Sequence, residues 1–350
     1  VLAGFSCSME DDAIMNDVEK GIEEATEAYT VLDFGVAFNE MATKASTTVV
    51  PGEDRPATGD ENNDEKKISE VSVFLLEDGK VIGILIPQNM NQVSSNSDGS
   101  ITLKDLKFVT KYKTNRTLEA HVVINGNQFL KNINIGDAQS ALNQQISGCL
   151  SADQLIKYGS TRIVFGKDIT NSYPSPSVAE NNPTTILVKV SHVAARLDFS
   201  QFDVTLKGFE GNPTVVFDEA KFVNLQQNGK IVEGDASVNV KDGAFLNRSN
   251  RIGTRWTDMG TAYGYANQYR QDSEMNTALY VKFTVDGRTF EKTYPINPAG
   301  ITKEVDHNGI KGGYLYDIKV RWTITPDWGD STIEFYTRDW VHNSIPEIVL

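Results

Sequence analysis

The residue types that most often carry out catalysis or bind metals are sparse in this sequence. The four histidines, His121, His192, His307 and His342, lie far apart, and none has cysteines or acidic residues at the spacing of metal ligands. The sequence contains no G-x-S-x-G, H-E-x-x-H or phosphate-binding glycine motif. We therefore predict that the protein is not an enzyme and that it has no catalytic residue, metal site or cofactor.

Two groups of polar residues could still bind a ligand. Asn96, Asp98 and Ser100 are spaced like part of a calcium-binding loop, but the other ligand positions are missing and a hairpin turn explains the three residues. Asp327 and Asp330 flank a Trp-Gly pair, which is also typical of a turn. Two carboxylates that come together only in the folded chain would leave no motif in the sequence. A hydrolase therefore stays a hypothesis, although it has less support than the two non-enzymatic functions given below.

The two cysteines are too few for a disulfide framework. Cys7 ends the stretch VLAGFSC, in which apolar and small residues lead into cysteine, as at the end of a bacterial lipoprotein signal. Gly4 stands where an aliphatic residue is usual, and a free cysteine in a frayed terminus is the alternative. We predict that residues 1–27 are a truncated signal and an acidic tether, with a lipid anchor on Cys7. Cys149 is expected to be a small buried apolar residue.

Length and charge limit the classes of protein that remain. The chain has 350 residues, enough for two domains, with 39% hydrophobic and 9% aromatic residues, as in globular proteins. Residues 1–67 hold 16 acidic and 5 basic residues, so they carry −11 of the net charge of −14. The rest is nearly neutral and has no basic stripe, which argues against nucleic acid as a partner.

The pattern of apolar residues predicts many short strands. From residue 68 onward, apolar runs alternate with turn signals such as Glu77-Asp78-Gly79 and the Asn-Gly pair that follows Ile124. Residues 136–159 are the main helical candidate, because apolar residues recur there at helical spacing. Residues 168–185 contain three prolines among serines and asparagines, which indicates a linker.

These elements predict a mainly β protein with two β-sandwich domains in series and one or two short helices. We place the N-terminal domain at residues 28–175 and the C-terminal domain at residues 176–350. Residues 45–67 have the composition of a flexible loop.

The strand predicted at residues 28–38 lies between the acidic lead and this polar loop. Burial of its four large apolar side chains would contribute about 6–12 kcal/mol, at roughly 1.5–3 kcal/mol each. A whole domain is typically stable by about 5–15 kcal/mol, so a strand cut away here would stay lodged until a similar strand replaced it. The alternative is an ordinary edge strand followed by a disordered loop. The residues on its inward face are Leu32, Phe34, Val36 and Phe38, preceded by Thr30.

The sequence resembles the fimbrillins of Bacteroidia, the type V pilins, over almost its whole length. The resemblance rests on the start GFSCS, on the strand Tyr29–Phe38 followed by Lys44-Ala45, and on the closing run YLYDIKVRWTI…STIEFYTRDWVHNSIPEIVL. The stretches HVVINGN and VKVSHVAARLDF are also similar.

This resemblance implies an acylated precursor on the outer membrane, which a trypsin-like protease cleaves and which then polymerises by donor-strand exchange. It also implies transthyretin-like domains. Carried onto this chain, cleavage would fall between Lys44 and Ala45 and would remove residues 28–44. The family's best-known processing follows arginine, but the first arginine here, Arg55, precedes a proline, which such proteases cut poorly. Residues 331–350 would supply the donor strand, through Trp340, Ile345, Ile348 and Leu350.

The expected function is that of a fimbrial subunit at the cell surface, which supports adhesion. Its partners would be other fimbrial subunits, the processing protease and a host or bacterial surface receptor. The alternative is a surface lipoprotein that does not polymerise and binds glycans or host ligands. Its binding site would be a loop at residues 244–273, where rings could stack on sugars unless they pack in the core. The rings of this loop are those of Trp256, Tyr263, Tyr265 and Tyr269.

Overall fold

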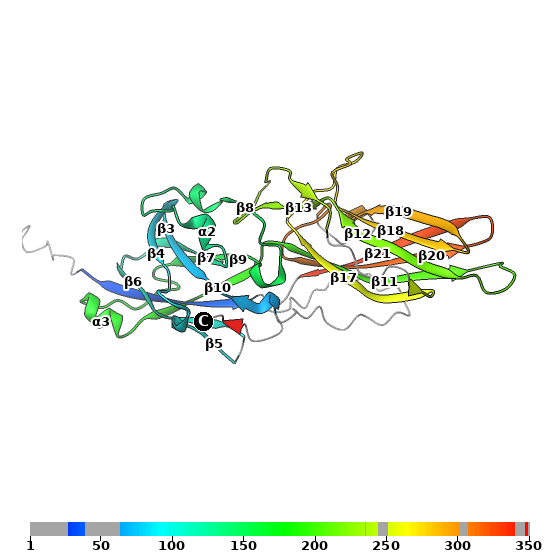
Figure 1. Cartoon of the computed structure of the whole chain (residues 1–350). Coiled ribbons are helices and arrows are strands. Elements are labelled where there is room, and N and C mark those ends of the chain that lie inside the picture. The colour runs from blue at the N-terminus through cyan, green and yellow to red at the C-terminus, as the bar shows by residue number, and fades with distance from the viewer. Residues whose placement is uncertain are drawn as a thin grey trace, which may run out of the picture.

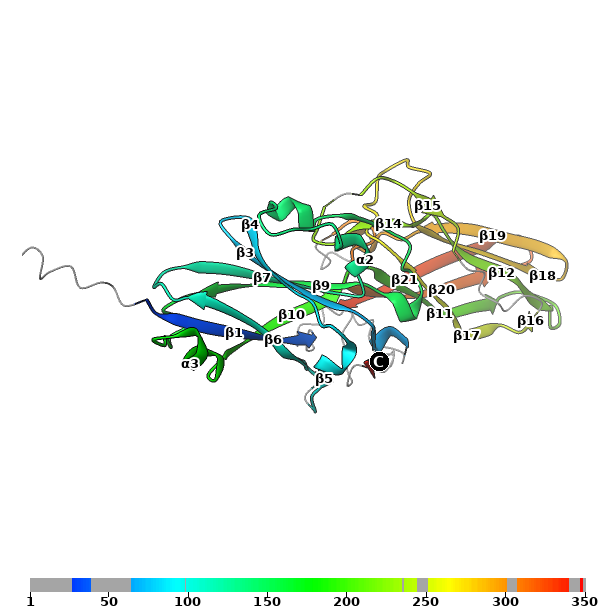
Figure 2. The same ribbon diagram turned by 60° about the vertical axis from the view of Figure 1, so that its left-hand side comes forward.

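Two β-sandwiches lie end to end in the computed structural model of the chain (Figures 1 and 2). The fold is mainly β, as predicted, and its short α-helices are α2 (Asn127–Leu130) and α3 (Pro176–Glu180). No helix of the described part of the chain is long and apolar enough to cross a bilayer. The structure describes residues 27–38, 64–97, 99–234, 236–243, 251–300, 307–339 and 347–348.

The N-terminal sandwich is one sheet that folds over on itself. Its described strands run in the order β4-β3-β7-β9-β10-β1-β6-β5, and the fold comes between β9 and β10, which share only two residue pairs. Aliphatic and aromatic side chains from both layers form the core between them. The strands are β1 (Tyr29–Phe38), β3 (Val71–Glu77), β4 (Lys80–Leu85), β5 (Val93–Ser95), β6 (Ile101–Lys111), β7 (Thr117–Ile124), β9 (Lys157–Val164) and β10 (Thr184–His192).

The C-terminal sandwich packs two described four-stranded sheets, β17-β11-β20-β21 and β16-β12-β18-β19. Phe202 lies at the centre of its core, with its ring centroid 5.3 Å from those of Trp256 and Phe283 and 5.5 Å from that of Phe217. The strands are β11 (Ala195–Leu206), β12 (Val215–Val223), β16 (Arg251–Ile252), β17 (Arg255–Gly264), β18 (Ala278–Val285), β19 (Arg288–Pro295), β20 (Tyr314–Ile324) and β21 (Gly329–Asp339).

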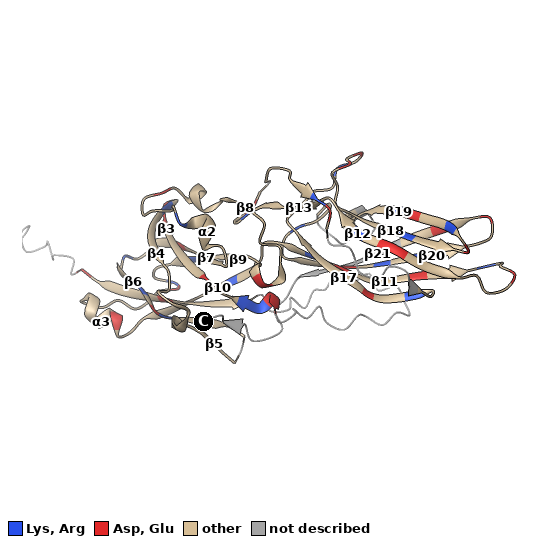
Figure 3. Cartoon of the chain, in the orientation of Figure 1, with Lys and Arg blue, Asp and Glu red and all other residues tan. Residues whose placement is uncertain are grey.

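Short strand pairs lie beside the main sheets, and two of them link the N-terminal and C-terminal halves of the chain. β14 (Asn228–Lys230), from the C-terminal half, pairs with β8 (Gln145–Ser147), and β13 (Leu225–Gln226) pairs with β15 (Val240–Lys241). β2 (Lys67–Ile68) pairs in parallel with β22 (Glu347–Ile348). A third hydrophobic cluster lies at the junction, where residues such as Ile231 and Leu315 of the C-terminal half pack with Phe74 and Leu130. Lys and Arg residues are interspersed with Asp and Glu along both sandwiches (Figure 3).

Turn chemistry explains the hairpin predicted at the start of the N-terminal sandwich. Asp78 and Gly79 have φ of 48° and 73°, the left-handed pair that a two-residue hairpin turn requires, and they join β3 to β4. Asn125 at the end of β7 is also left-handed, with φ of 58°.

Two predictions about the middle of the chain are wrong. Residues 136–159 form no α-helix but contain 3-10 turns and β8, because Gly148 and Cys149 have positive φ and Ile146 pairs with Gly229. The boundary at residues 175 and 176 is too early, because β10 pairs with both β1 and β9. The N-terminal sheet therefore continues to His192.

Gly159 permits the close approach of β9 and β10 where the sheet folds over. A Cβ at this position would lie 1.8 Å from the carbonyl oxygen of Lys189. We expect Gly159→Ala to lower the free energy of unfolding by about 1–3 kcal/mol, because the strands must move apart. Lys189→Ala keeps that carbonyl and should change stability by no more than about 0.5 kcal/mol. Urea unfolding followed by circular dichroism measures both, and equal stability of the two variants would contradict the prediction.

Candidate functional site

The candidate site is the position of β1 between β6 and β10, which we call the β1 slot. β1 runs parallel to β10, from the pair Leu32 with Thr184 to the pair Phe38 with Val190. On its other side it runs antiparallel to β6, beginning with Tyr29 opposite Lys111. β1 is therefore an internal strand, and the hypothesis of an edge strand is wrong. Its removal would leave two rows of unpaired backbone groups facing each other.

The inward face of β1 forms part of the core of the N-terminal sandwich. Leu32, Phe34 and Val36 have no exposed surface, and Phe38 is 6% exposed. They pack in one cluster with residues of both layers. The structure thus buries the four residues that the sequence placed on this face, and the slot is a row of apolar sockets.

The outward face of β1 is partly covered. α3 contacts both β1 and β6 and lies on the side of β1 away from β3 and β7 (Figures 1 and 2). Ser175 accepts the N-cap hydrogen bond of α3 from the amide of Val178, and the Lys107 ammonium donates to the carbonyl of Glu180 at 2.9 Å. Gly35 leaves room for little more than a methyl group, because a Cβ there would lie 3.2 Å from both the carbonyl oxygen of Ile101 and the side chain of Leu187.

Backbone and charged contacts hold the first residue of β1. Tyr29 and Tyr173 exchange reciprocal backbone hydrogen bonds of 2.8 Å. Glu27 pairs with Lys111 of β6 and accepts a hydrogen bond from the Tyr29 hydroxyl. The hydrogen bond from Lys111 lowers the pKa of the Glu27 carboxyl. The start of β1 is therefore held on one side by Tyr173, in the segment between β9 and β10, and on the other side by Lys111 of β6.

The residues that follow the stretch 39–63 are anchored at the junction of the two sandwiches. Glu65 lies in the 3-10 turn Asp64–Lys66 and has no exposed surface. Its carboxylate pairs with Arg196 of β11 at 3.0 Å and accepts a hydrogen bond of 2.5 Å from the Tyr263 hydroxyl of β17. Its carbonyl accepts a hydrogen bond of 2.8 Å from the buried ammonium of Lys157 in β9. We call Glu65, Lys157, Arg196 and Tyr263 the junction clamp.

Arg196 carries the positive charge of this clamp. Burial alone would lower the pKa of its guanidinium, but the nearby carboxylates of Asp198 and Glu65 outweigh burial and raise the pKa. Arg196 also pairs with Asp198 at 3.0 Å, so that two carboxylates share one cation. The clamp therefore joins the start of β2 to strands of both sandwiches.

The C-terminal end of the described chain approaches the same region. β21 is the last strand of its sheet among the described strands and pairs along its length with β20. The backbone at Glu347 and Ile348 then pairs with Lys67 and Ile68 of β2, next to β5. The tail thus returns to the N-terminal sandwich near the β1 slot.

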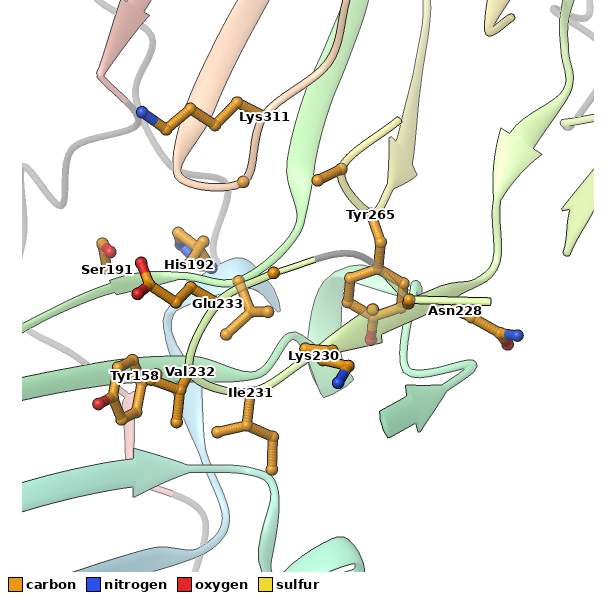
Figure 4. A pocket seen from close by; sticks show the side chains of 16 residues that line it. Tyr158, Ser191, His192, Asn228, Lys230, Ile231, Val232, Glu233, Tyr265 and Lys311 are labelled. Carbon is orange, nitrogen blue, oxygen red and sulfur yellow. The ribbon is translucent and has the colours of Figure 1, made fainter. Parts of the chain in front are cut away.

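A cavity of about 410 Å³ lies at the junction (Figure 4). Tyr158 and Ser191 of the N-terminal sandwich line it together with Glu233, Tyr265 and Lys311 of the C-terminal half. The Tyr158 hydroxyl is bonded to His121, and the Tyr265 hydroxyl donates to the carbonyl of Gly148 at 2.7 Å. The two rings are therefore already held by the protein, and the cavity is separate from the β1 slot.

The stretch 244–273, expected to be a loop, contains a strand in the part that the structure describes, and packing in the core is the interpretation of its rings that the structure favours. Residues Arg255–Gly264 form the strand β17, and Trp256 is 5% exposed within the core. Tyr265 is 1% exposed, Tyr263 is bonded to Glu65, and Tyr269 is half-buried. The alternation of this strand is broken at Asp258, which has φ of 51° and lies where the pairing of β11 with β17 shifts register. These rings pack against the protein instead of presenting a stacking surface.

Several predicted site residues lie outside the described residues. They are Cys7, Lys44, Ala45, Arg55, Trp340, Ile345 and Leu350, and Ile348 is described only by its backbone pairing. Within the described ranges, no group of three His, Cys, Asp or Glu residues could hold a metal ion.

Comparison with solved structures finds this architecture in fimbrial proteins. A candidate cell adhesion protein from Parabacteroides distasonis superimposes with a TM-score of 0.60 at 17% identity, over 91% of this chain and 99% of that one. A fimbrilin, FimA, from Porphyromonas gingivalis superimposes with a TM-score of 0.50 at 15% identity, again over 91% and 99%. The chain has the fimbrillin fold. No protein-family model matches the sequence, and no curated protein matches it either.

Within this fimbrillin fold, the junction clamp is the feature that the sequence analysis missed. Glu65 lies among many acidic residues that suggest a solvated loop. Arg196 and Asp198 alternate with the apolar residues of their strand, which predicts an ordinary solvated face, so no local pattern pointed to a buried carboxylate opposite Arg196.

Neutralisation of Glu65 tests the junction clamp. Glu65→Gln removes one of the two carboxylates that pair with the mostly buried Arg196 and leaves Asp198, and we expect it to lower the free energy of unfolding by about 1.5–3 kcal/mol. Asp64→Asn removes only an exposed pair with Lys67, so its effect should not exceed about 1 kcal/mol. Guanidinium unfolding of both variants provides the measurement. If Glu65→Gln is no less stable than Asp64→Asn, the clamp does not hold the junction.

Proposed function

We propose that the protein is a structural subunit of a cell-surface fimbria and that it polymerises when a strand of another subunit replaces β1. The observation that carries this proposal is the place of β1 in the sheet and in the chain. β1 is internal to its sheet. Only the stretch 39–63, which contains Lys44 and Arg55, connects β1 to the other strands of the sandwich. A single cut in that stretch would free the strand from every covalent bond to the sandwich. The fimbrillin fold supports the same conclusion.

The energetics of the β1 slot suit strand exchange. The four buried inward side chains of β1 contribute about 6–12 kcal/mol. An empty slot would lose this burial together with two rows of backbone hydrogen bonds. An incoming strand restores both by β-augmentation. The junction clamp begins after the stretch that would be cut, so cleavage leaves the two sandwiches joined.

The precursor would be exported as a lipoprotein, acylated at Cys7 and anchored to the outer membrane. A trypsin-like protease would cut between Lys44 and Ala45, with Arg55 as the second possible site. Cleavage after Lys44 removes 10 acidic and 2 basic residues and leaves a net charge of −6. The lost segment would take with it most of the charge that makes precursors repel one another.

The donor strand would come from residues 331–350, beyond or along β21. In a regular strand Trp340, Ile348 and Leu350 share one face, and Ile345 points to the other. A bulge at Pro346 would bring Ile345 to the same face, since proline cannot donate a ladder hydrogen bond. Polymers of this kind would support adhesion to a host or bacterial surface receptor.

Proteolysis of the purified full chain tests the proposal. Treatment with a trypsin-like protease should produce SDS-resistant ladders. Cleavage frees β1 to leave its slot, and the C-terminal strand of another subunit can then bind there. Lys44→Gln should abolish the ladders if Lys44 is the site, and Lys131→Gln, at an exposed lysine elsewhere, should leave them unchanged. N-terminal sequencing of the product then gives the cut. A chain that is cut within residues 39–63 and stays monomeric would rule out the proposal.

Truncation after Asp339 tests the donor. The truncated chain keeps β21 and should fold, but it should be unable to extend a polymer, because it has an acceptor slot and no donor tail. Mixed with the full chain at equal concentration before cleavage, it should shorten the polymers seen by electron microscopy. Polymers of unchanged length would show that residues 340–350 are not the donor.

A further inference from the structure

β1 places a polar atom in the core of the N-terminal sandwich. Thr30 lies on the inward face, two residues before Leu32, and has no exposed surface. Its hydroxyl oxygen is buried and has no hydrogen-bond partner among the described residues. The other inward positions of the strand are filled by Leu32, Phe34, Val36 and Phe38.

A second buried polar atom lies on the outward face of the same strand. Asp33 is half-buried, and its Oδ1 is buried without a hydrogen-bond partner in the described part of the chain. It lies where the pairing of β1 with β6 shifts register, between Leu32 opposite Phe108 and Phe34 opposite Leu103.

α3 covers this outward face. Val31 has no exposed surface although it alternates with the core residue Leu32, and it does not belong to the core clusters. Ala179 of α3 is likewise fully buried outside those clusters, and α3 contacts β1. The slot therefore encloses both faces of the first half of β1, so that the Thr30 hydroxyl and the Oδ1 atom of Asp33 are withheld from water, while the rest of the Asp33 side chain is partly exposed.

A buried hydroxyl or carboxylate without a partner weakens the state that contains it. The usual penalty for a buried neutral group such as the Thr30 hydroxyl corresponds to a factor of about 5 to 140 in an equilibrium constant. The partial exposure of Asp33 reduces the corresponding penalty for its carboxylate. The occupant of the slot bears this penalty, because both atoms belong to β1. A strand with apolar groups at the same two positions would make the same backbone hydrogen bonds without it.

We propose that Thr30 and Asp33 make β1 a weak occupant of its own slot, and that the slot selects a strand of another subunit that is apolar at both positions. The preferred strand would carry an aliphatic residue in the socket of Thr30, an uncharged apolar residue at the position of Asp33 and a residue no larger than glycine or alanine at the position of Gly35. The difference in affinity drives replacement forward. This inference rests on the proposed exchange of β1.

The test uses the full chain with the recognition sequence of a specific protease placed between Phe38 and Asp64, so that the cut does not depend on Lys44 or Arg55. After cleavage, an excess of a fluorescent peptide with the sequence of residues 27–39 is added, and its uptake reports release of the resident strand. Thr30→Val and Asp33→Leu replace each polar group by an apolar group of nearly the same shape. Thr293→Val, at an exposed site on β19, is the control.

We expect Thr30→Val to slow release of the resident strand by a factor of at least about 5. Asp33→Leu should slow release by a smaller factor, because that side chain is half-buried, and the control should be unchanged. Conversely, a peptide carrying Thr30→Val should displace wild-type β1 better than the wild-type peptide by a similar factor. The uncut Thr30→Val chain should also have a higher unfolding midpoint than wild type, which checks its folding.

Two results would be decisive against the inference, and they differ from each other. If the wild-type strand exchanges but Thr30→Val and Asp33→Leu release as fast as the control, the polar atoms do not weaken β1, and the proposed function still stands. If the cut wild-type strand never exchanges under excess peptide, the slot does not open, and both the inference and the proposed function fail.

Discussion

Backbone pairing of β1 on both of its edges is the interaction on which the N-terminal sandwich depends. β1 joins β10 in parallel and β6 in antiparallel orientation, and neither neighbour follows it directly in the chain. A parallel pair cannot be made by a tight turn, so β1 must reach β10 by way of most of the domain. β1 consequently lies inside the sheet, although it is the first of the described strands along the chain. Such a strand can be essential to the sheet and still be removable by a single cut.

The junction clamp complements this arrangement. Glu65 ties the chain just downstream of the stretch 39–63 to Arg196 and Tyr263 of the C-terminal sandwich and, through its carbonyl, to Lys157 of the N-terminal one. Buried ion pairs of this kind contribute orientation as much as stability, because their desolvation offsets much of the attraction between the charges. The sandwiches also share an apolar cluster at the junction. The relative position of the two domains therefore does not depend on β1.

The polar atoms of β1 contrast with the rest of its environment. The Thr30 hydroxyl and the Oδ1 atom of Asp33 are buried without hydrogen-bond partners among the described residues, whereas Val36 and Phe34 fill apolar sockets completely. Natural cores rarely leave polar groups unpaired, so each exception calls for a physical reason. The burial of its apolar side chains would let β1 stabilise the sheet before cleavage. Its unpaired polar atoms would make it easier to replace once it has been cut.

The sequence by itself determined the local features of this protein. The alternation along residues 29–38, the left-handed turn at Asp78 and Gly79 and the mainly β character follow from side-chain periodicity and backbone preference within a few residues. Only the tertiary structure decided that β1 is internal, that β10 belongs to the first sheet and that Glu65 meets Arg196. The helix predicted at residues 136–159 does not form, because the backbone pairing of Ile146 with the distant Gly229 overrides the local preference for a helix. Such contacts join residues tens to more than a hundred positions apart, and no local pattern specifies which strand edge or charge will lie opposite.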